Sequence, residues 1–194
     1  MPTFADVNFA MQRVQHTWGA HIPGGLLGYT ANQITVFPDE AGYTRAFRFI
    51  YDVVFKAANN FHQQAEDFID GVLAFVSPTF DHAKRKIYVA PKVQGYTQAQ
   101  QRMVLSHEYI HWLSHEKFYP TYYMVGGQHP FQIEGLTHWM TVACGYQLEA
   151  MTLPAYVDET TKADAWLRAD GGNRQRLLDF LFRGIPTDLS EIHP

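Results

Sequence analysis

The chain has 194 residues, a formal net charge of −4 and a sequence pI of about 6.2. Hydrophobic residues make up 46% and charged residues 18%, which excludes an intrinsically disordered chain and predicts one globular domain over residues 1–194. The acidic balance offers no basic surface to nucleic acid, and no segment approaches the ~18 consecutive apolar residues of a membrane span.

The N-terminal segment, up to Pro38, combines glycines with aromatic side chains. Residues 1–10 carry no basic segment followed by an apolar run, so we expect no signal peptide and a soluble protein, either cytoplasmic or exported by a leaderless route. Residues 22–25 contain a proline and two glycines and predict a turn, while residues 33–37 predict a short strand that ends before Pro38.

The middle of the chain changes from helical to strand-like spacing. Apolar side chains recur every three or four positions from Tyr43, which predicts an amphipathic helix that reaches about Ala58. The short apolar runs 72–76 and 86–90 predict the two strands of a hairpin. The basic residues 84–86 between them predict a solvated turn rather than a phosphate-binding patch.

Helices dominate the second half of the chain. Thr97 is a suitable N-cap for a helix over residues 98–117, and a second helix is predicted over residues 131–147 after a connecting loop. The C-terminal segment predicts two further helices, one beginning near Asp158 and one containing residues 177–181. Strands followed by helices in this order predict an α+β fold.

The predicted helix over residues 98–117 carries an H-E-x-x-H motif that begins at His107. Residues i and i+4 lie on one face of a helix, so His107 and His111 can both reach a single Zn²⁺ ion. Glu108 is displaced around the helix and can contact a water that the metal holds, as the general base of peptide hydrolysis must. The motif is expected by chance roughly 0.02 times in a chain of this composition, so we interpret it as a metal site.

A catalytic zinc site needs a third protein ligand. The single cysteine, Cys144, excludes a multi-cysteine cluster and is predicted to be a buried, inert thiol. His115 lies too far along the helix, because eight residues rise about 12 Å. His129 and His138 are suitable by residue type. We favour Glu134, which follows the motif after a loop long enough to turn the chain around and lies near the start of the next helix.

The motif followed by Glu134 and Gly135 resembles the gluzincin metallopeptidases, the zincins whose third ligand is a glutamate on the next helix. The resemblance implies that His107, His111 and Glu134 are zinc ligands and that Glu108 is the general base. It also implies a zincin-like α+β fold, in which a small mixed sheet with an edge strand packs on the active-site helix and a second ligand-bearing helix follows.

The likeness extends upstream to about residue 72 and downstream to about residue 147. Residues 73–78 and 86–89 resemble the zincin edge strand and its neighbour. In such enzymes the edge strand pairs with an extended substrate through backbone hydrogen bonds.

The chain departs from this pattern in one place. Thermolysin-like enzymes have an aspartate four residues after the glutamate ligand, where it orients a motif histidine, and here that position is His138. A histidine supplies no fixed negative charge at this position. The residue that stabilises the developing oxyanion is open among four candidates, of which the first is slightly favoured: Tyr123, Tyr122, His129 and Tyr146.

The sequence therefore predicts a zinc-dependent peptidase with one Zn²⁺ per chain and a peptide or protein substrate. Short zincins also occur among secreted toxins and effectors, for which an inhibitor or immunity protein would be a further partner. Two alternatives stay open: a zinc-binding interaction module without turnover, and a zinc amidase that acts on cell-wall peptides. The presence of Glu108 favours an enzyme, because a purely structural site needs the histidines but not the carboxylate between them.

Overall fold

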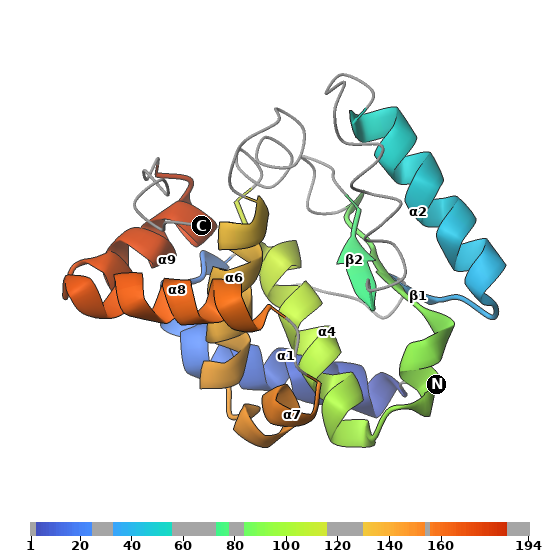
Figure 1. The fold of residues 1–194 in the computed structure, drawn as a ribbon, viewed down its shortest axis with the longest axis horizontal. Helices are drawn as coiled ribbons and strands as arrows, with labels where there is room; N and C mark the ends of the chain where they lie inside the picture. The colour runs from blue at the N-terminus through green and yellow to red at the C-terminus, as the bar shows by residue number, and fades with distance from the viewer. Residues whose placement is uncertain are drawn as a thin grey trace.

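The protein is built mostly from helices, and a small sheet lies toward one side of them (Figure 1). The computed structural model describes residues 3–24, 33–55, 73–77, 84–115, 130–153 and 156–185. The elements in chain order are α1 (Phe4–Trp18), η1 (Gly19–His21), β1 (Ile34–Val36), α2 (Glu40–Phe55), β2 (Ala74–Val76), β3 (Ile87–Val89), η5 (Pro91–Gly95), α4 (Gln98–Leu113), α6 (Pro130–Ala143), α7 (Gln147–Thr152), α8 (Val157–Ala169) and α9 (Asn173–Arg183).

The sheet is mixed, with strand order β1-β3-β2. Strand β1 runs parallel to β3, with Ile34 opposite Ile87, and β2 runs antiparallel to β3, with Ala74 opposite Val89. The predicted hairpin strands are therefore confirmed, and β2 is an edge strand of the sheet that the described residues form. The α+β class and the small mixed sheet of the sequence prediction are both present.

The two faces of the sheet pack on different helices. Ala74 and Val76 are buried on the face that contacts α4. On the opposite face, the ring of Phe75 stacks on Tyr88 at a centroid distance of 5.1 Å and meets Phe47 of α2 edge-on at the same distance. This alternation is the period-2 pattern of a strand covered on both sides.

Helix α4 begins at the predicted cap. The Thr97 side chain accepts a hydrogen bond from the backbone N–H of Gln100, and the Gln100 side chain accepts one from the backbone N–H of Thr97. This capping box satisfies two of the backbone donors that a helix start leaves without partners. The helix ends at Leu113, earlier than the predicted residue 117, because the backbone turns extended at Ser114.

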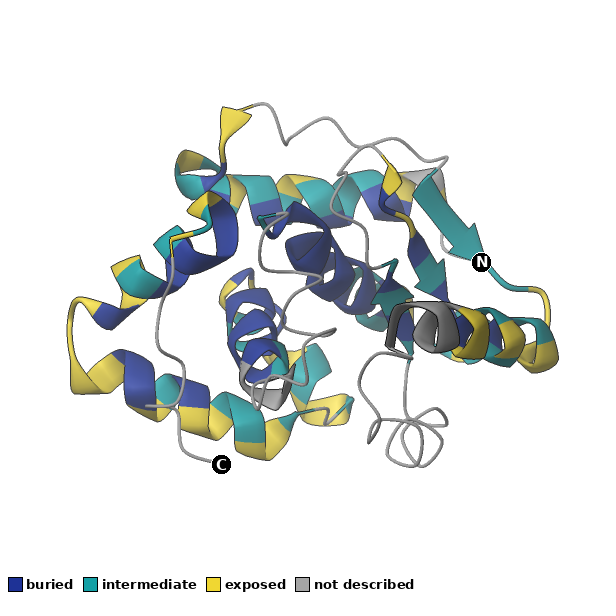
Figure 2. Ribbon diagram, turned by 90° about the horizontal axis from the view of Figure 1, so that it is seen from above, coloured by how far each residue is buried: buried dark blue, intermediate teal, exposed yellow. Residues whose placement is uncertain are grey.

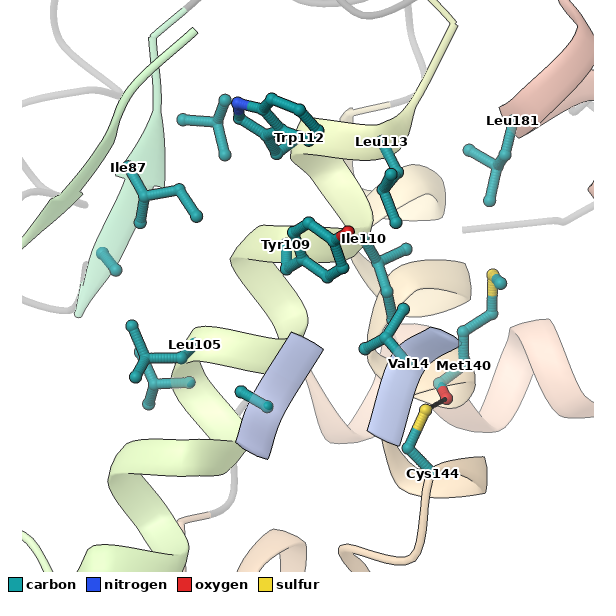
Figure 3. Close-up of a cluster of buried hydrophobic side chains, with 14 of the residues drawn as sticks. Val14, Ile87, Leu105, Tyr109, Ile110, Trp112, Leu113, Met140, Cys144 and Leu181 are labelled. Carbon is teal, nitrogen blue, oxygen red and sulfur yellow. Dashed lines mark hydrogen bonds between the residues drawn. The ribbon is translucent and has the colours of Figure 1, made fainter. Parts of the chain in front are cut away.

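Helix α4 lies at the centre of the molecule. All residues from Met103 to Leu113 are buried, whereas α2 and α8 alternate buried and exposed positions (Figure 2). Figure 3 shows the side chains around it: Ile87 of β3 lies on one side, and Met140 of α6 and Leu181 of α9 lie on the other. A helix enclosed in this way holds its polar side chains where water is scarce.

Two differences from the sequence prediction concern an unpredicted helix and a helix end. Helix α1 was not predicted, although Thr3 and Asp6 form a capping box at its start. The predicted helix over residues 131–147 ends at Ala143, because the chain turns at Gly145, whose φ of +96° favours glycine. Cys144 at this turn is buried and donates its S–H to the carbonyl oxygen of Met140, as Figure 3 shows.

The length and apolar character of each helix decide whether it could span a membrane. Among the residues described, none of the helices combines the length and the apolar character that a bilayer crossing requires.

Helices α6 and α8 approach each other closely at Gly135. A Cβ atom at this position would lie 2.5 Å from the backbone oxygen of Glu159 and 2.6 Å from its carbonyl carbon. Real Cβ atoms do not approach backbone atoms to this distance, so the absent side chain sets the spacing between the two helices. Gly135 directly follows Glu134, and the close contact therefore fixes the helix segment that carries this carboxylate.

We expect Gly135→Ala to lower the free energy of unfolding by about 2 kcal/mol, because the overpacking outweighs the helix propensity that alanine adds. Urea denaturation followed by circular dichroism measures the loss. Gly19→Ala is the matched control, since Gly19 has helical dihedral angles and a Cβ atom added there would meet no atom within 4 Å. Equal stability of the two variants would contradict the close contact between α6 and α8.

Candidate metal centre

Three side chains from α4 and α6 converge on one point. His107 and His111 lie one helical turn apart on α4, and Glu134 lies in the early part of α6, which packs against α4. The Nε2 atoms of the two histidines are 3.1 Å apart. The Glu134 Oε2 atom is 3.0 Å from the His107 Nε2 atom and 3.2 Å from the His111 Nε2 atom.

This triangle of donor atoms fits a tetrahedral metal site. Zinc binds histidine nitrogen and carboxylate oxygen at about 2.0–2.1 Å, which places neighbouring ligands of a tetrahedron about 3.3 Å apart. The three observed separations of 3.0, 3.1 and 3.2 Å lie close to that value. Among the described residues, His107, His111 and Glu134 are the group of histidine, cysteine and acidic side chains that could hold a metal ion.

The alternative third ligands lie elsewhere or outside the described residues. The His138 ring lies 5.9 Å from the His107 ring and does not belong to the group of converging donor atoms. His115 lies beyond the end of α4, where its backbone N–H donates to Leu181 of α9 and its ring contacts Gly184. His129 is outside the described residues. The geometry therefore supports the choice of Glu134.

Of the four residues predicted as candidates for stabilising an oxyanion, Tyr146 has its surroundings described. Tyr146 is buried, its hydroxyl oxygen is 3.0 Å from the Ser106 Oγ atom, and that Oγ atom is also 3.4 Å from the carbonyl oxygen of Ala10 on α1. This places Tyr146 in the contact between α1 and α4, where it has a packing role. Tyr122 and Tyr123 are outside the described residues.

Glu108 is buried beside the metal-binding group. Burial raises the pKa of Glu108 to about 8; the charge of His111 lowers this pKa and the charge of Glu134 raises it. With a pKa of about 8, this carboxyl group is mostly protonated at neutral pH. A neighbouring divalent cation would lower this pKa toward the working range.

The three converging side chains perturb one another. Burial favours the neutral acid of Glu134, but His111 and His107 hold the pKa of Glu134 well below its usual value, so this group is a carboxylate. Burial alone would lower the pKa of His111, but Glu134 and Glu108 raise it overall. The pKa of His107 is lowered by burial and by the charge of His111. An anionic carboxylate facing two imidazoles is a donor set suited to a cation.

Tyr156 is a site residue that the sequence analysis missed. Its ring lies parallel to that of His107, with an interplanar angle of 11° and a centroid distance of 5.8 Å, and meets the His138 ring edge-on at 6.2 Å. Its φ of +54° is the only positive value among the described residues other than glycine. It directly precedes α8, well beyond the motif and Glu134, and no motif spacing indicates it.

The sequence analysis also misjudged the environment of Arg85. The prediction of a solvated turn at residues 84–86 is wrong for Arg85, which is fully buried, whereas Lys84 and Lys86 are exposed. The Arg85 Nη1 atom donates to the backbone oxygens of Trp112 at 2.6 Å and Ser114 at 2.5 Å. A cation at the C-terminus of α4 binds the carbonyls that the helix end leaves without partners.

The chain matches no protein-family model, no curated protein and no solved structure in comparisons with known proteins. The geometry itself shows two imidazoles and a carboxylate that could hold one metal ion. Imidazole and carboxylate ligands suit zinc and also other divalent transition metals, so the ligand set alone does not define the ion.

We expect Arg85→Met to lower the free energy of unfolding by roughly 3 kcal/mol, because it removes charge-assisted hydrogen bonds from buried carbonyl groups. Urea denaturation measures the change. Lys86→Met is the control, since this neighbouring side chain is exposed and its replacement should change stability by less than about 0.5 kcal/mol. Equal effects of the two substitutions would show that Arg85 does not anchor the end of α4.

Proposed function

We propose that this chain is a zinc-dependent peptidase that hydrolyses peptide bonds, with Glu108 as general base and His107, His111 and Glu134 as the metal ligands. The observation that carries the proposal is the convergence of the three donor atoms, 3.0–3.2 Å apart, beside a buried carboxyl group that is not one of the ligands. Metal binding alone would not require that fourth group.

The roles of the protein groups follow from their positions. Zn²⁺ bound at this site would supply a Lewis acid that polarises the substrate carbonyl and lowers the pKa of a water to about 7. Glu108 accepts the proton of the attacking water and returns it to the leaving amine.

Strand β2 is the proposed binding edge for an extended substrate. The Ala90 N–H donates to the Leu73 oxygen, and the Ser77 N–H donates to the Lys86 oxygen, so alternate residues of β2 bond to β3. In an antiparallel ladder the residues between them, Ala74 and Val76, direct their N–H and C=O groups away from β3. A peptide in extended conformation can pair with these groups, and α4 lies against the same strand.

The arrangement of the elements agrees with this function. A small mixed sheet whose edge strand packs on the motif helix, followed by a second helix that carries the carboxylate, is the order expected of a zincin-like domain. We extend the proposal to one such domain over residues 1–194.

The zinc ligands are tested by metal analysis. Wild-type protein dialysed against a slight excess of Zn²⁺ should hold one ion per chain, and Glu134→Ala should lose most of it because one of three protein ligands is gone. His115→Ala is the control and should load normally, since its ring lies against α9. Full zinc loading of Glu134→Ala would show that the third ligand is a different residue.

Turnover is tested with a diverse peptide mixture read by mass spectrometry, with and without a chelator. Wild-type protein should cleave defined bonds, and the chelator should abolish cleavage. Glu108→Gln should bind zinc as wild type does and should lose at least about 10²-fold in rate, because the substitution keeps the side-chain volume and removes the basic carboxylate.

The matched control is Glu149→Gln on α7, which should leave the rate unchanged. Cleavage by Glu108→Gln at the wild-type rate would refute the general-base mechanism. If wild-type protein holds zinc but cleaves neither peptides nor cell-wall fragments, the chain is a zinc-binding interaction module.

A further inference from the structure

The imidazole of His107 is enclosed by aromatic rings. The His111 ring meets it edge-on at a centroid distance of 4.8 Å, the His138 ring lies at 5.9 Å, and the Tyr156 ring lies parallel to it at 5.8 Å. Contacts of this kind are the preferred offset and edge-to-face geometries of aromatic pairs. His107 therefore has ring neighbours from three elements: α4, α6 and the residue before α8.

The hydrogen bonds of His107 do not explain its orientation. Within the described part of the chain they all use Nε2, which faces Glu134 and His111. A metal-binding histidine is usually oriented from its other ring nitrogen, by a carboxylate, a backbone carbonyl or water. The residue four positions after Glu134, from which an aspartate could reach a ligand histidine, is the buried His138.

Tyr156 has an unusual backbone conformation at the start of α8. Its left-handed conformation, with φ of +54° and ψ of +36°, is uncommon for a side chain of this size. Its carbonyl oxygen accepts a hydrogen bond from the Thr160 N–H at 2.8 Å, which ties it to the first turn of α8. Helix α8 is in turn fixed on α6 by the close contact between Gly135 and Glu159.

We propose that Tyr156 is a positioning residue that, together with His138, holds the ring of His107 in its ligand orientation by aromatic packing, in place of a hydrogen-bonded carboxylate. The inference rests on the proposed metal centre. It requires the ring of Tyr156 and does not require the hydroxyl group. It also requires a flat ring at position 138 rather than the imidazole nitrogens.

Two pairs of variants distinguish the effect of the aromatic ring from the effect of the polar group. Tyr156→Phe keeps the ring and Tyr156→Leu removes it, while both leave an apolar side chain with a Cβ atom in the same backbone conformation. His138→Phe and His138→Leu form the second pair. The measured quantity is the dissociation constant for Co²⁺, obtained by competition with a chelator, together with the visible absorption of the bound ion, which reports ligand geometry.

The phenylalanine variants should bind Co²⁺ with wild-type affinity and absorption. The leucine variants should bind about tenfold more weakly, the lower end of what outer contacts of a metal ligand contribute, and should show an altered absorption spectrum. Tyr88→Leu is the control, since Tyr88 stacks on Phe75 on the sheet face that α2 covers. It should lower the thermal midpoint without weakening Co²⁺ binding.

Each result decides the inference. Wild-type affinity in both leucine variants would overturn it, and so would equal weakening of Tyr156→Phe and Tyr156→Leu, which would assign the effect to the hydroxyl. A phenylalanine–leucine difference in one pair supports the inference even where the other pair fails to fold. If wild-type protein binds no Co²⁺, the proposed metal centre itself is wrong, and the inference fails with it.

Discussion

The burial of ionisable side chains on a central helix is the constraint on which the structure depends. His107, Glu108 and His111 lie on α4, where every residue from Met103 to Leu113 is buried. Removing such groups from water is costly unless charges and hydrogen bonds compensate. The compensation comes from a second helix, because the Glu134 carboxylate contacts both imidazoles. The position of α6 is thus set by electrostatics as well as by apolar packing.

Each end of α4 is fixed by a different device. At the N-terminus the capping box of Thr97 and Gln100 satisfies backbone donors, and at the C-terminus the buried guanidinium of Arg85 satisfies backbone acceptors. The Trp112 indole N–H donates back to the Arg85 oxygen at 3.3 Å, so the segment before β3 and the end of α4 hold each other. This reciprocal contact connects the sheet to the helix turn that carries His111. The sheet and the turn of α4 that carries His111 are therefore held in a fixed relative position.

The parts of the site that could be predicted from sequence are those encoded by local spacing. The i, i+4 histidines, the Thr97 cap and the placement of Glu134 early in the next helix all depend on helix geometry within short segments.

Arg85 and Tyr156 could not be predicted from local spacing. A basic residue between two lysines has the local pattern of a solvated turn, and only the tertiary position of the helix end explains its burial. Tyr156 reaches His107 because α8 packs closely on α6. This close packing is possible because Gly135 has no Cβ atom. Helix α1 did carry a local signal, the Thr3–Asp6 capping box followed by the apolar positions Val7, Ala10 and Val14, and this signal could have predicted it.

The protein groups of the site also favour a cation over a simple hydrogen-bonded cluster. Two Nε2 atoms at 3.1 Å and a carboxylate oxygen within 3.2 Å of both present several acceptor lone pairs to one small volume. Protons can satisfy this arrangement only in part, because burial lowers the pKa of His107 and the nearby charge on His111 opposes a second protonation. Burial is the main reason why the pKa of the neighbouring His138 is lowered to about 4. This ring therefore brings no positive charge at neutral pH. A divalent ion satisfies all three donors at once and brings the positive charge that the carboxylate requires. The same ion would favour the ionised form of Glu108, whose pKa burial raises to about 8.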